Sequence, residues 1–193
     1  MLADQPGCDE ALELLCQCVT NDPGNLIFVE TFLSAIKHRD RPPGPFRGVL
    51  KRVSCLNAVK RSDWDAVLHL GPELILLRPA DAQVLCGLAT ASQHRGLDDV
   101  SIRYWTVANE LLPNDEDVQQ RAALAFGEHG YFGQAAECWR RVLRRSPNHA
   151  QANALAKLFA SLTVDSHQAS SGEPGGELPS NIEDCVEQAR QAA

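Results

Sequence analysis

Prolines at a constant interval constrain this chain more than any other feature. Pro79, Pro113 and Pro147 are equally spaced along the sequence. Proline cannot continue a helix, because its ring clashes with the preceding turn and its nitrogen has no hydrogen to donate. We therefore predict that each proline follows the second helix of a helical hairpin. The stretch "LLPNDEDVQQ", residues 111–120, is then a joint between two copies of one unit.

The shift that superimposes these prolines, here called the repeat shift, also aligns further columns of similar residues. Gly96 and Gly130 share a column with Ser62, at the point where a first helix ends and a left-handed residue costs least without a Cβ. The other columns hold small side chains, where paired helices approach closely, or aromatic rings: Cys55, Ala89 and Ala123; Val67, Ser101 and Ala135; Ala58, Ser92 and Phe126; Trp105 and Trp139. Apolar residues also recur with helical spacing.

Polar residues that favour helix starts lie at the expected places. Asn25, Asp81 and Asp115 are predicted N-caps. Ser62 is predicted to cap a helix that opens at Asp63, and Asn148 with Gln151 forms a capping-box pattern. One departure stands out, because Gly71 and Pro72 fall inside a second helix, where proline removes a hydrogen bond. We expect a bend between Leu70 and Glu73.

These columns resemble those of the tetratricopeptide repeat (TPR), a helix–turn–helix unit of about 34 residues. "GEHGYFGQAAECWRRVLRRSP", from Gly127 to Pro147, is the cleanest copy. The stretches "DPGNLIFVETFLSAI", "KRSDWDAVLHLGPELILLRP" and "FGQAAECWRRV" are further similar to a poorly characterised group of bacterial TPR proteins. The resemblance implies an all-α fold, a right-handed superhelical solenoid of TPR-type hairpins, and an interaction role without catalytic residues.

The chain divides by composition into five predicted parts. Residues 8–39 have the pattern of a separate helical hairpin, which we expect to stack on the first repeat, and "HRDRPPGPFRG" interrupts the chain after it. Ser, Gly, Pro and Glu dominate residues 165–180 and predict a flexible linker. The predicted parts are an N-terminal hairpin (1–40), a Pro-rich basic loop (41–48), a TPR array of three repeats plus a final capping helix (48–163), a linker (164–181) and a short C-terminal helix (182–193).

Charge and cysteine content limit the function classes. A formal net charge of −7 argues against nucleic acid or an anionic membrane as the main partner, since both require a basic face. The seven cysteines are scattered, and no signal peptide or membrane span is recognisable, so we expect a reducing cytoplasm. Walker, nucleophile-elbow and zinc-spacing patterns are absent from the sequence. These features predict neither an enzyme nor a cofactor.

The first helices of a TPR array line a concave groove, and the resemblance therefore implies candidate binding positions. They are Arg52, Leu56, Gln83, Thr90, Gln93, Gln120, Arg121, Leu124, Leu155 and Leu158. Three interpretations remain open: a groove for an extended or helical peptide, a carboxylate clamp, or a solvated inner face. Arg52 and Arg121 occupy clamp positions, but Leu56 and Gly87 replace the asparagine partners that the clamp requires.

A second candidate is a basic loop with Lys37, Arg39, Arg41 and Arg47, where a flexible segment can adapt to an anionic group. We predict a non-catalytic scaffold or adaptor that presents its groove to a protein or peptide. Two alternatives remain: a structural building block that self-associates, and a regulatory subunit that docks on an enzyme through the basic loop.

Overall fold

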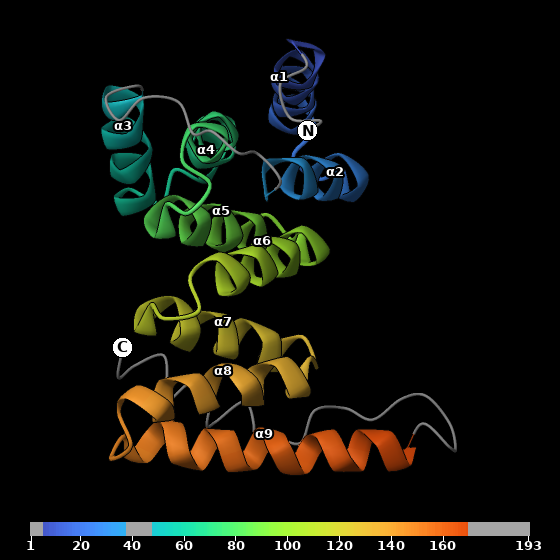
Figure 1. Ribbon diagram of the computed structural model, residues 1–193, viewed down its shortest axis with the longest axis vertical. Coiled ribbons are helices and arrows are strands. Elements are labelled where there is room, and N and C mark those ends of the chain that lie inside the picture. The colour runs from blue at the N-terminus through green and yellow to red at the C-terminus, as the bar shows by residue number, and fades with distance from the viewer. Residues whose placement is uncertain (1–5, 38–47, 170–193) are drawn as a thin grey trace. The chain divides into compact units, whose positions relative to one another are not determined.

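The computed structural model describes residues 6–37 and 48–169 (Figure 1). Within these ranges the chain forms nine α-helices and no strand. The helices are α1 (Pro6–Asn21), α2 (Leu26–Lys37), α3 (Val49–Lys60), α4 (Trp64–Leu77), α5 (Ala82–His94), α6 (Asp98–Leu111), α7 (Glu116–Glu128), α8 (Phe132–Arg145) and α9 (Ala150–Ala169). The all-α prediction is confirmed for this part of the chain. Helix α9 continues to Ala169, beyond the predicted start of the linker at residue 164, and the rest of the predicted linker and the predicted C-terminal helix lie outside the described residues.

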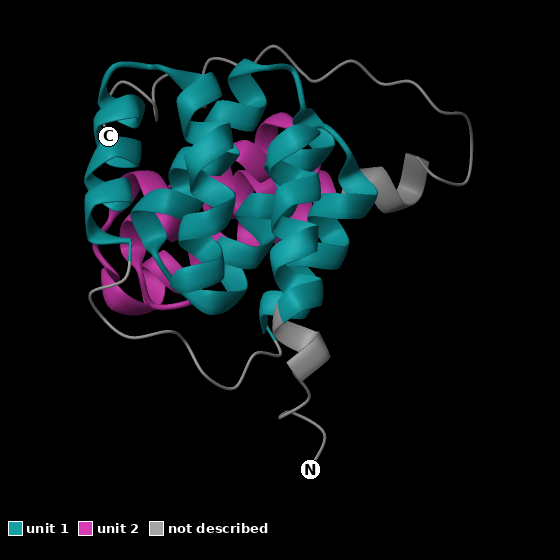
Figure 2. Cartoon of the chain, turned by 90° about the horizontal axis from the view of Figure 1, so that it is seen from above, with its two compact units in different colours: residues 1–112 teal, residues 113–193 magenta. Residues whose placement is uncertain are grey.

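The helices belong to two compact units, residues 1–112 and 113–193 (Figure 2). The boundary falls inside the stretch at residues 111–120 that the sequence marks as a joint. In each unit, helices that follow one another in the chain pack together: α3 to α6 in unit 1, and α7 to α9 in unit 2. Handedness and a superhelical course through both units stay predictions.

The three hairpin joints have the same backbone geometry, which confirms the column of glycines. Ser62, Gly96 and Gly130 all have positive φ, at 56°, 68° and 79°. The N–H of the next residue then donates to the carbonyl five residues back, at 2.9, 2.9 and 2.8 Å in the three joints. These bonds satisfy carbonyl groups at the end of the first helix. The period of the sequence is therefore a structural repeat as well.

Small side chains lie where paired helices approach. Ala89 of α5 and Ser101 of α6 are fully buried, and the Ser101 hydroxyl donates to the Ala89 carbonyl oxygen at 2.9 Å. In unit 2, Ala123 and Ala135 occupy the equivalent positions and are also fully buried. A buried hydroxyl needs a hydrogen-bond partner, and here the facing helix provides it.

The N-terminal hairpin packs on the second helices of the first two repeats. Helix α1 contacts α4, and α2 contacts α6. Two ion pairs join α2 to α6: Lys37 with Glu110, and Arg103 with Glu30 at 3.6 Å. The buried apolar residues of α2 are Val29, Phe32, Leu33 and Ile36. The prediction that this hairpin stacks on the first repeat holds for α1, while α2 reaches one repeat further along the chain.

Gly71 has a clear packing role in α4. A Cβ atom at Gly71 would lie 2.5 Å from Leu88 Cδ2, so Leu88 of α5 packs directly on α4 at the position where the next two repeats have tryptophan in the sequence. The helix runs without interruption from Trp64 to Leu77, and Pro72 is buried inside it. The expected bend between Leu70 and Glu73 stays a prediction.

Unit 2 is a hairpin of α7 and α8 that is covered by α9. Phe132 stacks on Phe159 with ring centroids 6.1 Å apart, and Phe159 also lies over Gly127, where a Cβ would come within 2.5 Å of its ring. Trp139 is buried. Helix α9 therefore covers the apolar side of α8, as expected for a final capping helix.

The predicted helix caps are mostly confirmed. Asp81 and Asp115 accept hydrogen bonds from the N–H groups of Val84 and Val118, at 3.3 and 3.1 Å. Asn25 likewise accepts from the N–H of Phe28, at 3.3 Å.

Two other predicted caps are wrong. Asp63, and not Ser62, caps α4, because Ser62 has the left-handed conformation that ends the preceding turn. At α9 the ring nitrogen Nδ1 of His149 accepts from the Ala152 N–H at 3.1 Å, and the helix begins at Ala150. Asn148 is thus too far from the helix start to cap it.

Candidate functional site

Helix α3 exposes apolar side chains to an unusual extent. Val49, Leu50 and Val53 are 43%, 84% and 51% exposed, and Leu56 is half-buried. With about 100° between successive residues of a helix, these four side chains lie on one side of α3, here called the α3 stripe. Cys55 and Ala58 are the buried residues of α3, and its main contacts among the described helices are with α4 and α5. Contiguous exposed apolar patches are common at interaction surfaces, so this side of α3 is a candidate site.

The side of α3 next to this stripe faces α5. A Cβ atom at Gly87 would lie 2.9 Å from Val59 Cγ2, so the two helices cross closely at this point. Both are the first helices of their hairpins, as the sequence register requires for a groove. Leu56 and Thr90, two predicted groove residues, are both half-buried on these helices.

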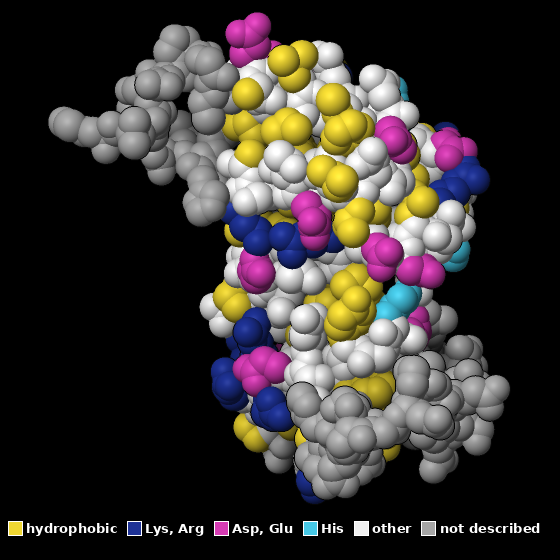
Figure 3. Space-filling view, turned by 90° about the vertical axis from the view of Figure 1, so that its right-hand side faces the viewer, with side chains coloured by type: hydrophobic (Ala, Val, Ile, Leu, Met, Phe, Trp, Pro, Cys, Tyr) yellow, Lys and Arg dark blue, Asp and Glu magenta, His cyan; other side chains and the backbone are white. Residues whose placement is uncertain are grey.

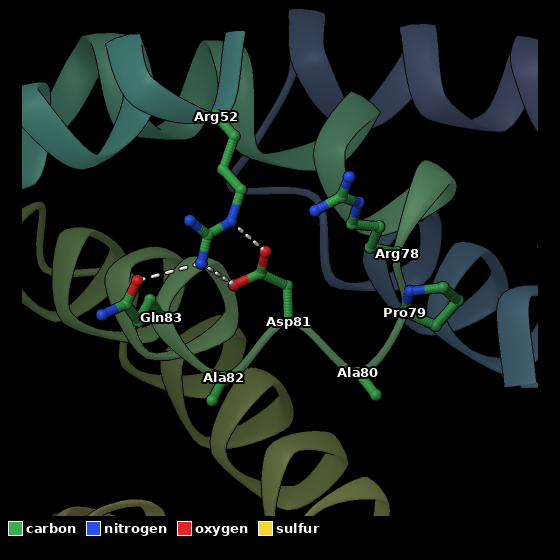
Figure 4. Close-up of a pocket in the computed structure, with 7 residues that line it drawn as sticks. All are labelled: Arg52, Arg78, Pro79, Ala80, Asp81, Ala82 and Gln83. Carbon is green, nitrogen blue, oxygen red and sulfur yellow. Dashed lines mark hydrogen bonds and ion pairs between the residues drawn. The ribbon is translucent and has the colours of Figure 1, made fainter. Parts of the chain in front are cut away.

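Arg52 forms a bidentate ion pair with Asp81 where α5 begins. Its Nε lies 2.5 Å from Asp81 Oδ2, and its Nη2 lies 3.2 Å from Asp81 Oδ1 and 2.9 Å from Gln83 Oε1 (Figure 4). We call these three residues the Arg52 cluster. The carboxylate of Asp81 is almost fully buried, at 7% exposure, and it also caps α5. A carboxylate with this many donors fixes the position of the guanidinium.

The electrostatics of the cluster follow from the same contacts. The hydrogen bond with Asp81 raises the pKa of Arg52 above its ordinary value, and this effect outweighs the opposing effect of burial. Behind it, burial raises the pKa of the Cys55 thiol to about 11, and the charge of Asp81 adds to the increase. Burial and this raised pKa favour the protonated form of the Cys55 thiol at neutral pH.

An open pocket of about 520 Å³ lies at this end of α5 (Figure 4). Arg52 and Gln83 border it on one side, and Arg78, which ends α4, borders it on the other. The remaining lining residues are Pro79, Ala80, Asp81 and Ala82. The pocket combines guanidinium and amide groups with small apolar surfaces. We call the Arg52 cluster, this pocket and the α3 stripe together the α3–α5 site.

The other predicted groove residues lie in different surroundings. In unit 1, Gln93 is half-buried near the end of α5. In unit 2, Arg121 pairs with Asp117 at 3.1 Å and Gln120 donates to Glu116 at 3.3 Å, both one turn away on α7. Leu124 and Leu155 are buried, and Leu158 is half-buried. A groove that runs through both units stays a prediction.

The basic loop lies almost entirely outside the described residues. Arg39, Arg41 and Arg47 belong to residues 38–47, which the structure does not describe. Lys37, at the end of α2, is paired with Glu110 of α6. This lysine therefore helps to hold the N-terminal hairpin on α6.

Features typical of metal binding, disulfide bonding or membrane insertion are not found among the described residues. Among them no group of three or more His, Cys, Asp or Glu side chains could hold a metal ion. The described cysteines Cys16, Cys18, Cys55, Cys86 and Cys138 are free thiols. No helix in residues 6–37 or 48–169 has both the length and the apolar character needed to cross a membrane.

Sequence reasoning missed two groups of site residues. Asp81 is predicted only as a helix cap and Arg78 is not predicted at all, and the stripe residues Val49, Leu50 and Val53 are not among the predicted binding positions.

The sequence does hold a signal for Asp81. Arg52 precedes Asp81 by the same distance at which Cys86 precedes Asp115, so only the first of these two helix caps has a cation at the equivalent position. The stripe residues had no signal, since exposure depends on which helices pack on α3.

Comparison of the sequence with models of known protein families gives no match. Comparison with curated proteins gives no match either.

Proposed function

We propose that this protein is a non-catalytic binding protein of TPR type, and that the α3–α5 site receives a protein or peptide partner. The observation that carries the proposal is the α3 stripe, an exposed apolar surface beside a fixed arginine and an open pocket. The three equivalent joints support the TPR-like architecture. A right-handed solenoid that extends the groove through unit 2 is part of the same proposal.

The proposed mechanism is recognition by a surface that is already ordered. Arg52 is held by two contacts with Asp81 and one with Gln83, so its rotamer is fixed before a partner arrives. The stripe lies on a helix that is packed against α4 and α5. Binding then orders few receptor side chains, and this lowers the entropic cost of association. The partner supplies apolar side chains for the stripe and polar groups for the pocket.

The proposal also places the protein in the cytoplasm. Cys55 and Cys138 are buried, and burial raises the pKa of the Cys138 thiol to about 12. Buried, protonated thiols in free form are typical of a reducing compartment.

A display experiment tests the proposed function. The full chain is panned against a library of random peptides, with the Val53→Asp variant as a counter-target. A matched control, Ser34→Asp, changes an exposed residue of α2 in the same unit. We expect enriched peptides that bind the wild-type chain and Ser34→Asp equally and that lose at least about tenfold affinity for Val53→Asp, which places an unpaired charge in the apolar contact.

One result counts against this function, and two further measurements serve as controls. Enriched peptides that bind all three proteins equally would show that the α3 stripe is not the binding surface. Circular dichroism of the variants checks that each remains folded, because a surface substitution normally changes stability by less than about 0.5 kcal/mol. Sedimentation equilibrium addresses self-association, since a monomer of 21.1 kDa contradicts an obligate building block.

A further inference from the structure

Helix α3 exposes to solvent the same side that, in α5, packs against α3. Under the repeat shift, Leu50 corresponds to Val84 and Val53 corresponds to Gly87. Val84 and Gly87 are both buried, and Gly87 is the point where α5 meets Val59 of α3. Leu50 and Val53 occupy the same positions but remain exposed. The missing neighbour of α3 is therefore a helix, because the equivalent surface of α5 is covered by one.

The expected neighbour does not come from the N-terminal hairpin. The main contacts of α1 and α2 are with α4, α6 and each other, which lie on the second-helix side of unit 1. The main contacts of the described helices thus leave the stripe uncovered, although an amphipathic hairpin precedes it in the chain.

The charge of α3 indicates the sign of the partner. The helix contains no acidic residue. Lys51 pairs with Glu73 at 2.6 Å and Arg52 pairs with Asp81, so these two cations are balanced inside unit 1. Lys60 and Arg61, at the other end of the helix, are exposed and form no ion pair with described residues. A partner that lies along the stripe meets a positive end that no ion pair with the described residues neutralises.

Two other surfaces carry less information. Hydrophobic side chains also gather in the upper part of Figure 3, where Figure 1 places α1 and α2, and Ile27 of α2 is 73% exposed. No equivalent surface in the repeats shows which kind of element would cover it. The arginines of α8 surround Glu137, which accepts from Arg140 at 2.9 Å and lies 3.3 Å from Arg144. Their charge is therefore partly balanced within the helix.

We propose that the partner at the α3 stripe is an amphipathic helix with acidic flanks, which packs on α3 as α3 packs on α5. Its apolar side chains, spaced i, i+3, i+4 and i+7, cover Leu50 and Val53, and its carboxylates face Lys60 and Arg61. This is the helix-in-groove mode of recognition. The inference rests on the proposed function and adds the conformation and the charge of the partner.

Two synthetic peptides test the inference. Both are fluorescein-labelled helices of about 16 residues, near the length at which an isolated helix becomes stable, with the same leucine spacing. One carries glutamates on its flanks, and its twin carries lysines. Fluorescence anisotropy measures the binding of each peptide to the full chain. We expect the lysine twin to bind about tenfold more weakly, because two cation–carboxylate contacts become repulsive.

Variants of the full chain identify the contacts. Leu50→Asp removes the most exposed apolar residue of the stripe, and we expect it to weaken both peptides by at least about tenfold. The double variant Lys60→Glu/Arg61→Glu is expected to weaken the glutamate peptide and to leave the lysine twin unchanged or tighter. Matched controls are Ile27→Asp, on the other exposed apolar surface, and Lys157→Glu, an exposed lysine of α9. Neither control should change binding.

The outcomes separate this inference from the proposed function. Equal binding of the two peptides, both lost in Leu50→Asp, overturns the acidic preference while the proposed function stands. Loss of binding in Ile27→Asp that equals the loss in Leu50→Asp overturns the assignment to α3. A dimer in sedimentation equilibrium that Leu50→Asp dissociates overturns the proposed partner, because the stripe then belongs to an interface between two copies. If panning yields no peptide that depends on Val53, the proposed function itself fails.

Discussion

Helices α3 and α5 occupy the same register of the repeat but differ in their surroundings. Eight residues of α5 are buried, compared with two of α3. Among the described helices, the main contacts of α5 are with α3, α4 and α6, whereas those of α3 are with α4 and α5. The sequences of the two helices reflect this difference at two positions, where α3 has the polar residues Lys51 and Ser54 and α5 has the fully buried Leu85 and Leu88.

The comparison is more informative at the positions where α3 keeps apolar residues although they are exposed. An end helix that faces only water needs polar residues on its outer side, yet Leu50 and Val53 are apolar and exposed. The smaller number of helices around α3 thus explains its polar residues Lys51 and Ser54, but it does not explain Leu50 and Val53. The proposed binding role would account for them, and the variants below test whether α3 and α5 differ in energy as they differ in burial.

The largest expected effect is at Leu88. This side chain is fully buried and lies against Gly71 of α4. We expect Leu88→Ala to lower the free energy of unfolding by about 2–5 kcal/mol, because a cavity remains where the side chain was. Urea denaturation followed by circular dichroism measures the change. A loss below about 1 kcal/mol would show that α5 is packed no better than α3.

Gly71→Ala tests the same contact from the opposite side. The new Cβ would approach Leu88 Cδ2 to 2.5 Å, so the leucine or the backbone of α4 must shift. We expect a loss of about 1–3 kcal/mol from overpacking, although alanine is the better helix former. The same urea titration applies, with Gly71→Ala/Leu88→Ala as the double variant. If the clash is the cause, the double variant is more stable than the sum of the single losses predicts.

Cys55 reports on the buried side of α3. Its folded pKa of about 11 exceeds the ordinary value of 9.0, so folding favours the protonated thiol. This stabilisation is complete below pH 9, and it decreases as the pH rises from 9 to 11. We expect Cys55→Ala to lose less stability than wild type over this interval. Parallel loss in both proteins, in urea titrations at several pH values, would show that the α3 thiol is not protected.

Ser62 and Gly96 compare the joints that follow α3 and α5. Both residues have positive φ, which costs about 1 kcal/mol or more for serine and little for glycine. We expect Ser62→Gly to raise the free energy of unfolding by up to about 1 kcal/mol and Gly96→Ser to lower it by a similar amount. Calorimetry of the two variants measures both. Equal signs for the two substitutions would contradict the equivalence of the joints.

The smallest expected effect is at Leu50. Because this side chain is 84% exposed, Leu50→Ala should change the free energy of unfolding by less than about 0.5 kcal/mol. The contrast with Leu88→Ala is the point of the measurement. A loss above about 2 kcal/mol, the cost of a buried leucine, would mean that α3 is covered in solution and has no free stripe.

Much of the fold follows from local signals in the sequence. The three prolines and the Gly96 and Gly130 positions locate the joints, because their backbone chemistry acts within a few residues. Asp81 and Asp115 mark helix starts for the same reason. The caps at α4 and α9 were misplaced by one residue, since Ser62 and Asp63 are both polar and only the backbone conformation distinguishes them.

The candidate site was predicted less completely. Arg52, Leu56 and Gln83 follow from the repeat register, which says which residues share a face of a helix. The ion pair of Arg52 with Asp81 joins residues that are distant in the sequence, and its geometry depends on how α3 lies against the start of α5. The exposure of Leu50 required knowledge of every neighbour of α3.

The sequence by itself determined the helices, their joints and the constant repeat shift, because helix ends are set by steric and hydrogen-bonding properties of nearby residues. Only the tertiary structure decided that α1 and α2 pack on α4 and α6 and that the α3 stripe stays open. Apolar faces of different helices are chemically alike, so their pattern says that each must be buried but not against which partner.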